Sequence, residues 1–228
     1  MNIGRLKNGG CRAEDDPKAP INPYGASKLM TETMLAHGAA AHGFNYGVLR
    51  YFNVAGADPD GRADQSTPGA THLIKVAAEC AVGKRSSVQV LGTDFDTPDG
   101  TGIRDYIHVS DLARAHVLAL PRLHEERFLS FAYNCGYGHG YSVLEVLDAV
   151  DRVLGHKQAR TVGNRRAGNP AALVADSSAI RSHLDWQPLY DDLDTIVAHA
   201  LAWERKLHGM SCQGSPVSVA GQGTGDPR

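Results

Sequence analysis

The chain has 228 residues, of which 42% are hydrophobic and 21% charged, so it can bury a substantial core and wholesale disorder is excluded. Its 23 lysines and arginines against 25 aspartates and glutamates give a formal net charge of -2, which excludes the basic field that nucleic acid or an anionic membrane surface requires. The 4 cysteines lie far apart, the 11 histidines show no metal-ligand spacing and no apolar run approaches the roughly 20 residues of a membrane span, so we expect a reduced, cytoplasmic protein with neither a metal site nor a membrane segment.

An irregular segment opens the chain. Residues 1–19 contain Asn-Gly-Gly and Glu-Asp-Asp-Pro runs with little apolar periodicity, so they predict a loop, and the ordered chain is expected to begin near Pro20. Beyond it, helical periodicity alternates with short apolar runs. In chain order the predicted elements are a helix at 24–42, a buried parallel strand at 46–52, a helix at 72–82, a strand at 88–91, a helix at 110–120, a strand at 131–135, and helices at 143–154, 177–184 and 193–207.

Local signals mark the ends of several of these elements. Pro23 suits the first turn of the first helix, and Gly43 ends that helix. Ser110 and Asp111 can cap the helix that follows them. The segment Ser142–Glu145 fits a capping box, in which a serine and a glutamate three residues apart satisfy the free amides of a helix start.

The order of elements indicates the fold class. Helices that alternate with short apolar strands predict an α/β layer structure, and the mostly helical last third predicts a smaller lobe packed at one end. The Gly/Ser/Pro-rich stretch at 209–228 predicts a disordered tail. A complete dinucleotide-binding fold would carry a glycine fingerprint after its first strand, and no G-x-G-x-x-G or G-x-x-G-x-x-G stands near the N-terminus of this sequence.

Tyr24 and Lys28 are the first candidates for chemistry. Four residues apart at the start of a helix, they project from one helix face. A phenol is a poor base at neutral pH, but an adjacent cation stabilises the phenolate, and Lys28 supplies that cation. A tyrosine and a lysine at this spacing are also common on exposed helices, so the pair alone leaves a purely structural role open.

Three segments give the chain a specific resemblance. Asn22–Lys28 (N-P-Y-G-A-S-K) resembles the catalytic helix of extended short-chain dehydrogenases/reductases. Leu49–Ala57 (L-R-Y-F-N-V-A-G-A) and Asp99–Val109 (D-G-T-G-I-R-D-Y-I-H-V) are similar to two later segments of the UDP-glucose 4-epimerases, in the same order. The resemblance covers residues 19–207, and Asp99–Val109 is its most discriminating part.

The resemblance implies a fold and a division of the chain. The fold would be the C-terminal part of a Rossmann-like parallel-sheet domain with a small, mostly helical substrate-binding lobe. On this basis residues 20–208 form a partial NAD-dependent epimerase domain in which the substrate lobe is interleaved. The irregular segment 1–19 precedes it, and the disordered tail 209–228 follows it.

The resemblance also implies an activity and its residues. Tyr24 would be the acid/base and Lys28 would bind the nicotinamide ribose of NAD, with Tyr51 and Phe52 beside the cofactor. The activity would interconvert UDP-galactose and UDP-glucose by transient oxidation at C4 of the sugar. The residues implied in UDP-sugar binding are Asn53, His72, Leu73, Arg104, Arg166 and Asn169.

Physical chemistry supports the arginines among these residues. A nucleoside diphosphate needs cations, and the planar fork of arginine pairs with phosphate oxygens. Arg166 also stands beside Arg165, so a solvated basic pair is its bland alternative. Asp105 and His108 are expected to position Arg104 and to cap the following helix rather than to catalyse.

Two positions depart from the family pattern. Asn169 stands where epimerases commonly carry an aspartate, so an acceptor carboxylate becomes a neutral amide and a sugar or ribose contact is altered. His72 stands where other members carry asparagine, which marks a different branch of the family.

A larger departure concerns the start of the chain. The phosphate-binding glycines, the acidic residue for the adenosine ribose and the upstream catalytic serine or threonine of the family have no counterpart in residues 1–19. About one ordinary domain of the family is therefore expected to be missing through N-terminal truncation or a misassigned start. A non-catalytic remnant that cannot hold NAD is the main alternative to an active epimerase.

Related nucleotide-sugar enzymes share part of this motif set. A UDP-pentose 4-epimerase fits the same motifs, whereas a nucleotide-sugar 4,6-dehydratase would need an acidic pair that this sequence does not show. An open parallel sheet exposes edges and apolar faces, so we expect either pairing with another chain or aggregation on overexpression. Family members are commonly dimers, which leaves a homodimer open.

Overall fold

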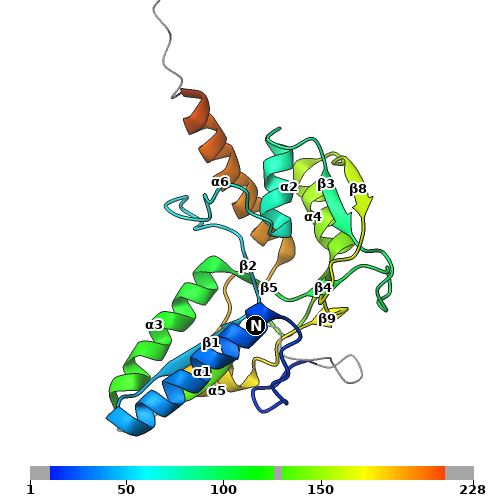
Figure 1. Ribbon diagram of the computed structural model, residues 1–228. Helices are drawn as coiled ribbons and strands as arrows, with labels where there is room; N and C mark the ends of the chain where they lie inside the picture. Colours follow the sequence, from blue (N-terminus) through cyan, green and yellow to red (C-terminus); the bar gives the residue numbers. More distant parts are fainter. Residues whose placement is uncertain (1–10, 126–129, 214–228) are drawn as a thin grey trace, which may run out of the picture.

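The computed structural model describes residues 11–125 and 130–213, and helices alternate with short strands throughout (Figure 1). In chain order the elements are α1 (Pro23–His42), β1 (Gly47–Tyr51), β2 (Asn53–Ala55), α2 (Leu73–Ala81), β3 (Val88–Leu91), β4 (Ile103–Arg104), β5 (Tyr106–His108), α3 (Val109–Glu125), β6 (Phe131–Cys135), β7 (Tyr141–Ser142), α4 (Val143–Leu154), β8 (Arg160–Gly163), β9 (Ala172–Leu173), α5 (Ser178–Leu184) and α6 (Leu193–Gln213).

Most strand pairs are parallel, as an α/β fold requires. β1 pairs with β6, β2 with β5 and β3 with β8, all in parallel, and β4 pairs in parallel with β9 and antiparallel with β7. Parallel strands need crossover connections, and helices supply them along this chain. The prediction of an α/β fold with parallel sheets is confirmed.

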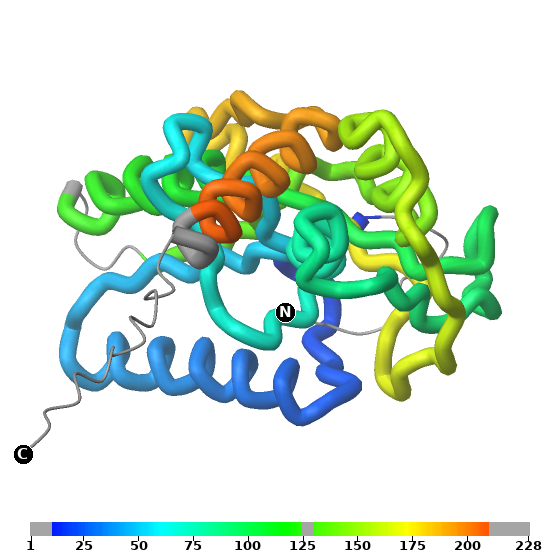
Figure 2. The backbone as a smooth tube through the Cα atoms, turned by 90° about the horizontal axis from the view of Figure 1, so that it is seen from above, coloured from blue at the N-terminus to red at the C-terminus, as the bar shows by residue number. Residues whose placement is uncertain are grey.

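The chain weaves between two groups of elements. α1 and α3 lie on either side of β1 in both views, and α5 packs on β6 in the same group (Figures 1 and 2). α2, α4 and α6 pack on one another beside β3 and β8, and form the second group (Figure 1). A continuous apolar core joins the two groups, and its fully buried side chains include Ile107, Leu147, Trp186, Ile196 and Leu201.

The predicted helix boundaries follow from local capping. The side chain of Asn22 accepts a hydrogen bond from the amide of Gly25 at the start of α1, and Gly43 ends this helix in the left-handed conformation, with φ of 70°. The capping box at the start of α4 is confirmed, because Ser142 and Glu145 exchange side-chain and backbone hydrogen bonds. Each of these interactions joins residues that are only a few positions apart, so the sequence pattern is enough to predict them.

Several boundaries differ from the prediction. α3 begins at Val109 and continues past residue 120 to Glu125, with Pro121 inside the helix. α6 continues to Gln213, so the predicted tail is wrong at 209–213, while 214–228 lies outside the described residues. The expected buried strand at 46–52 is only half-buried, because Arg50 is its one fully buried member and β1 pairs with β6 on one side.

The N-terminal segment is irregular but bonded to the fold. Residues 1–10 lie outside the described part, and the described chain begins at Cys11, before the expected start at Pro20. Arg12 forms a parallel bridge to Ala175, and the Glu14 carboxylate accepts a hydrogen bond of 2.7 Å from the amide of Asn134. These bonds reach across more than a hundred residues of sequence, which local composition could not reveal.

Among residues 11–125 and 130–213, no helix is both long enough and apolar enough to span a membrane. Large apolar side chains do remain exposed on α1 and α3, namely Met30, Met34, Val117 and Leu120. The aggregation expected from the sequence therefore stays a prediction, with these side chains as its candidate surface.

A buried polar network corrects the role predicted for Asp105 and confirms the helix cap predicted for His108. The Asp105 carboxylate accepts hydrogen bonds from the backbone amides of Tyr137, Gly138 and Ala175, so it fastens two loops and does not hold the Arg104 side chain. Burial raises its pKa, against the lowering effect of these hydrogen bonds. His108 does cap α3, because its Nδ1 accepts from the amide of Ser110 at 3.1 Å.

The helix-cap role predicted for Asp111 is also wrong. Its carboxylate is fully buried and accepts hydrogen bonds from the Tyr137 hydroxyl at 2.8 Å and from the amides of Leu189 and Tyr190. These partners come from distant segments, so the residue joins α3 to the chain that precedes α6. A sequence pattern that is typical of a helix cap therefore belongs here to a residue that makes tertiary contacts.

Because His108 is buried, we expect the folded protein to lose stability in acid. Burial, with the nearby His199, lowers the pKa of His108 to about 4, while Asp111 and Asp58 oppose this shift. The unfolded chain binds this proton near pH 6.5, so the stabilising contribution is complete above that pH and is lost as the pH falls toward 4. The expected loss is about 3 kcal/mol in the free energy of unfolding.

Urea unfolding between pH 7.5 and pH 4.5 measures this loss, with a His108→Gln variant as the control that should lose less over the same range. NMR titration of the His108 ring gives an independent reading. A ring that takes up its proton near pH 6.5 in the folded protein would contradict the prediction.

Candidate functional site

The first two turns of α1 place Tyr24 and Lys28 together. Asn22 and Pro23 fix the helix start, so the two side chains follow one another on one face. The Lys28 ammonium lies 5.1 Å from the centroid of the Tyr24 ring, and the phenol is 62% exposed. Both line a cavity of about 260 Å³ between α1 and β1 that also contains Tyr51.

A buried ion pair holds this part of α1 against the sheet. The guanidinium of Arg50 on β1 donates from two nitrogens to the two carboxylate oxygens of Glu32 on α1, each at 2.8 Å. Burial alone would raise the pKa of Glu32, but the hydrogen bonds from Arg50 and Lys18 hold it below its ordinary value. The pair therefore fixes the distance between α1 and β1, and with it the shape of the cavity.

A second cavity, of about 520 Å³, is lined by residues of β2, α2, β3, β4, β5 and the start of α4, together with the loop that contains Arg166. Such a volume suits a small-molecule ligand. Its lining includes all six residues that the sequence predicted for UDP-sugar binding, which are Asn53, His72, Leu73, Arg104, Arg166 and Asn169.

Pairing and a helix start position the first three of these residues. Asn53 opens β2, in register with Tyr106 of β5. His72 is the N-cap residue of α2, but its side chain makes no capping hydrogen bond. The first amides of α2, beginning at Leu73, therefore keep the partial positive charge of a helix start at the cavity wall. An apolar residue such as Leu73 can contribute there through its backbone.

Arg104 carries a positive charge held by neutral groups. Its guanidinium donates to the backbone carbonyls of Ile103 at 2.6 Å and of Pro170 at 2.9 Å. Burial lowers its pKa, although an arginine stays protonated at neutral pH. Because these carbonyls fix its direction without neutralising it, the guanidinium is available to an anion in the cavity.

The loop that contains Arg166 closes the same cavity. Arg165 stacks on Phe95, with its guanidinium carbon 4.1 Å from the ring centroid. The next residues turn back, because the amide of Asn169 donates to the carbonyl of Arg166, and Gly168 takes a positive φ of 75°. Arg165 and Arg166 therefore do not form the solvated basic pair considered as the alternative. Arg165 packs on an aromatic ring, whereas Arg166 lines the cavity.

The two cavities are neighbours. Tyr51 lines the first and Asn53 the second, only two residues apart along the β1–β2 run. A methyl group placed on Gly168 would lie 3.9 Å from the Cβ of Asn22, so the Arg166 loop reaches the start of α1. The start of α1, which carries Tyr24, and the loop that contains Arg166 therefore lie close together.

Phe52 is the predicted site residue that lies elsewhere. Successive strand residues point to opposite faces, so Tyr51 faces Tyr24 while Phe52 lines a separate small cavity with Arg12 and Asp16. The structure does not bring it to the cavity with Tyr24 and Lys28.

Sequence reasoning missed further lining residues, among them Arg85, Gln89 and Phe95. On β3 the exposed Gln89 stands between the buried Val88 and Val90, so period-two alternation could have identified Gln89 as a side chain that points out of the core. Arg85 follows α2 and forms an ion pair of 2.5 Å with Glu79. No local sequence pattern predicts this ion pair. In the described part of the chain, no group of three or more His, Cys, Asp or Glu side chains could hold a metal ion.

A protein-family model matches more than half of this chain. The model described as the NAD dependent epimerase/dehydratase family matches residues 3–136. The chain is 58% identical over 194 residues to the UDP-glucose 4-epimerase of Azospirillum brasilense, which covers 85% of this chain and 56% of that protein. It is 45% identical over 190 residues to that of Lacticaseibacillus casei, which covers 83% of this chain and 57% of that protein.

Solved structures give the same result. The UDP-glucose 4-epimerase of Bifidobacterium longum, in complex with NAD+ and UDP, superposes with a TM-score of 0.81 at 41% identity, over 86% of this chain and 58% of that chain. The enzyme of Brucella ovis, in complex with NAD, superposes with a TM-score of 0.80 at 44% identity, over 88% of this chain and 60% of that chain. The chain thus spans somewhat more than half the length of the relatives it matches.

Proposed function

Because this chain belongs to the NAD dependent epimerase/dehydratase family, we propose that it carries out 4-epimerisation of a UDP-sugar, interconverting UDP-galactose and UDP-glucose with NAD as cofactor. The observation that carries the proposal is the single cavity that gathers Asn53, His72, Leu73, Arg104, Arg166 and Asn169 beside the Tyr24 and Lys28 pair. These residues are spread over more than a hundred positions of the sequence, and the proposal is that one nucleotide-sugar contacts both cavities.

We propose a division of labour along the joined cavities. Arg104 and Arg166 with the amides at the start of α2 bind the diphosphate, because all of them present positive charge to anionic oxygens. Asn53 lies between this end and Tyr24 and orients the sugar. The substrate lobe consists of α2, α4, α6, β3 and β8, interleaved within a domain that continues to the end of α6 at Gln213.

The residues at α1 fit one end of the cofactor. A phenol and an ammonium lie side by side in a cavity of about 260 Å³, a size that takes the nicotinamide ribose but not the whole dinucleotide. Lys28 would donate to the ribose hydroxyls, and Tyr51 would lie beside the ring. When bound, NAD supplies the acceptor and donor of the C4 hydride.

Tyr24 then moves the proton. Its oxygen takes the proton of the C4 hydroxyl as the sugar is oxidised and returns it when the ketone is reduced from its other face. The Lys28 ammonium stabilises the phenolate that acts as base, since opposite charges nearby favour the ionised form. The diphosphate end stays bound while the sugar ring turns, so the ketone is not released.

The non-catalytic alternative is less well supported. The described cavity residues are in place, and the relatives that the chain matches are UDP-glucose 4-epimerases. A chain that had drifted from its role would be free to lose the positive charges that face the cavity, yet Arg104 and Arg166 both line it.

Binding of UDP tests the diphosphate end directly. We expect Arg104→Met to weaken the Kd for UDP by about 10- to 100-fold, because a charge-assisted hydrogen bond contributes about 1.5–3 kcal/mol. Arg104→Lys should give an intermediate loss, since it keeps the charge without the fork. Isothermal titration calorimetry measures both variants.

The matched control is Arg152→Met, which removes an exposed arginine from the outer face of α4. It should leave the Kd unchanged. Thermal melts confirm that each variant is folded. Equal affinity of the wild type and a folded Arg104→Met for UDP would overturn the placement of the diphosphate.

A further inference from the structure

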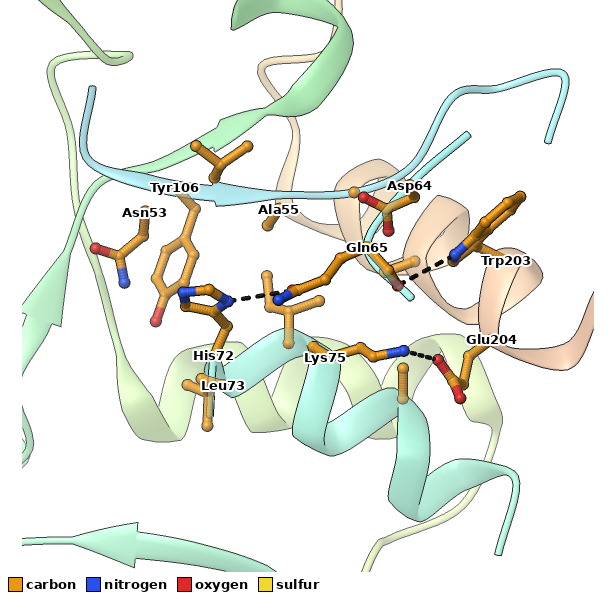
Figure 3. Close-up of a pocket in the computed structure, with 15 residues that line it drawn as sticks. Asn53, Ala55, Asp64, Gln65, His72, Leu73, Lys75, Tyr106, Trp203 and Glu204 are labelled. Atoms are coloured by element: carbon orange, nitrogen blue, oxygen red, sulfur yellow. Dashed lines mark hydrogen bonds and ion pairs between the residues drawn. The ribbon is translucent and has the colours of Figure 1, made fainter. Parts of the chain in front are cut away.

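His72 lines the large cavity. Its side chain does not cap α2 and instead contacts the loop that precedes this helix. Its Nδ1 lies 3.1 Å from the Oε1 of Gln65, in the long loop between β2 and α2. Figure 3 shows the two side chains pointing toward each other, with Asn53 and Tyr106 on the other side of the imidazole. The ring also borders a smaller cavity of about 40 Å³, which is too small for a nucleotide.

Two side chains of α6 hold the loop that contains Gln65 by hydrogen bonds. The indole Nε1 of Trp203 donates to the backbone carbonyl of Gln65 at 3.3 Å (Figure 3). Nearby, the Lys206 ammonium donates to the carbonyl of Gly61 at 2.6 Å. The backbone of the loop at Gln65 is therefore held by α6 and not by the contact with His72.

A hydrogen bond to an amide oxygen selects one form of the imidazole. A neutral imidazole has one N–H donor and one lone-pair acceptor, and the partner of one nitrogen determines the role of the other. Since the Gln65 oxygen only accepts, Nδ1 of His72 must carry the proton. The Nε2 of His72 then presents its lone pair.

Three charged side chains of the large cavity are donors alone. Arg85, Arg104 and Arg166 line the same cavity and can only donate. A UDP-sugar carries hydroxyl groups and a uracil N–H that need an acceptor when they leave water. A lone pair at His72 would add an acceptor to those of the Asn53, Gln89 and Asn169 amide oxygens in this cavity.

We propose that Gln65 is a positioning residue that holds His72 in its Nδ1–H form, so that His72 Nε2 accepts a hydrogen bond from a hydroxyl or N–H group of the bound UDP-sugar. This inference rests on the proposed function. Gln65 does not line the large cavity, so it acts on the ligand only through the imidazole.

A double-mutant cycle tests the link. Gln65→Met is expected to weaken the Kd for UDP-glucose by about 3- to 10-fold, the usual effect of one neutral hydrogen bond. In a His72→Asn background the same Gln65→Met change should have no effect, because an asparagine can turn its own amide oxygen to the ligand. The exposed Gln187→Met is the matched control, for which no change is expected.

The choice of ligand locates the donor group. Equal losses for UDP and UDP-glucose place the donor on the nucleoside, whereas a loss confined to UDP-glucose places it on the hexose. A Gln65→Met effect that persists in the His72→Asn background would show a merely structural role for the loop and overturn the inference.

NMR of the free protein gives a reading that needs no ligand. Long-range proton–nitrogen correlation spectra are expected to show the His72 proton on Nδ1 in the wild type and a mixture of both forms in Gln65→Met. A proton on Nε2 in the wild type overturns the inference even where UDP-glucose binds. A wild type with the Nδ1 proton that binds neither UDP nor UDP-glucose overturns the proposed function instead.

Discussion

Replacing Tyr24 by phenylalanine is expected to slow the conversion of UDP-galactose to UDP-glucose, assayed with added NAD, by about 10²- to 10⁴-fold. The phenylalanine keeps the ring beside Lys28 and removes only the oxygen that carries the proton. The Kd for UDP should change by less than about twofold, because the diphosphate binds among Arg104, Arg166 and the start of α2. A loss of turnover with unchanged affinity separates the chemical end of the site from the binding end.

Tyr46→Phe is the matched control, since Tyr46 lines a different cavity on another side of α1. It should keep wild-type turnover. Two results would contradict the role of Tyr24: a Tyr24→Phe variant as active as the wild type, or a variant that loses UDP affinity and turnover in parallel. A wild-type chain that binds UDP but shows no turnover with NAD would favour the non-catalytic alternative.

Breaking the ion pair between Glu32 and Arg50 is expected to have the largest effect on stability. Both side chains are nearly buried, with 10% and 4% of their surfaces exposed. Glu32→Leu would leave the Arg50 guanidinium buried with only the Glu14 carbonyl as a partner, at 3.1 Å. We expect it to lower the free energy of unfolding by about 3–5 kcal/mol, the usual cost of a buried charge that has lost its partner.

The double variant Glu32→Leu/Arg50→Leu should recover most of this loss, because replacing both charges of a buried pair by apolar groups is often neutral. Urea unfolding curves measure all three proteins. Asp194→Leu breaks the exposed pair of Arg152 and Asp194, whose side chains are 58% and 46% exposed, and should cost less than about 1 kcal/mol. A double variant as unstable as Glu32→Leu would show that the cost arises from packing and not from the stranded charge.

This pair also bears on function. Glu32 lies two turns beyond Tyr24 on α1, and Arg50 directly precedes Tyr51, which lines the cavity with Tyr24. An ion pair buried at this place fixes the phenol relative to the strand that leads to Asn53. The stability and the geometry of the site therefore depend on the same contact.

The amino-acid sequence by itself determined the helix starts and ends that rest on local bonds. The Asn22 cap, the Ser142 capping box and the glycine at 43 act within four residues, so the pattern of the chain is enough to place them. The motif of Tyr24 and Lys28 on one helix face is equally local.

Only the tertiary structure decided which distant residues meet. Gln65 reaches its partner Trp203 across 138 positions, and the amide of Asn134 reaches Glu14 across 120, so no sequence window contains both members of either pair. The sequence misassigned Asp111 for the same reason, since its acceptor oxygens fit a helix cap as well as the tertiary contacts they make. Helix caps and turns are bonded within the neighbourhood that the chain itself provides, whereas a cavity wall and a buried charge acquire their partners only when remote segments pack together.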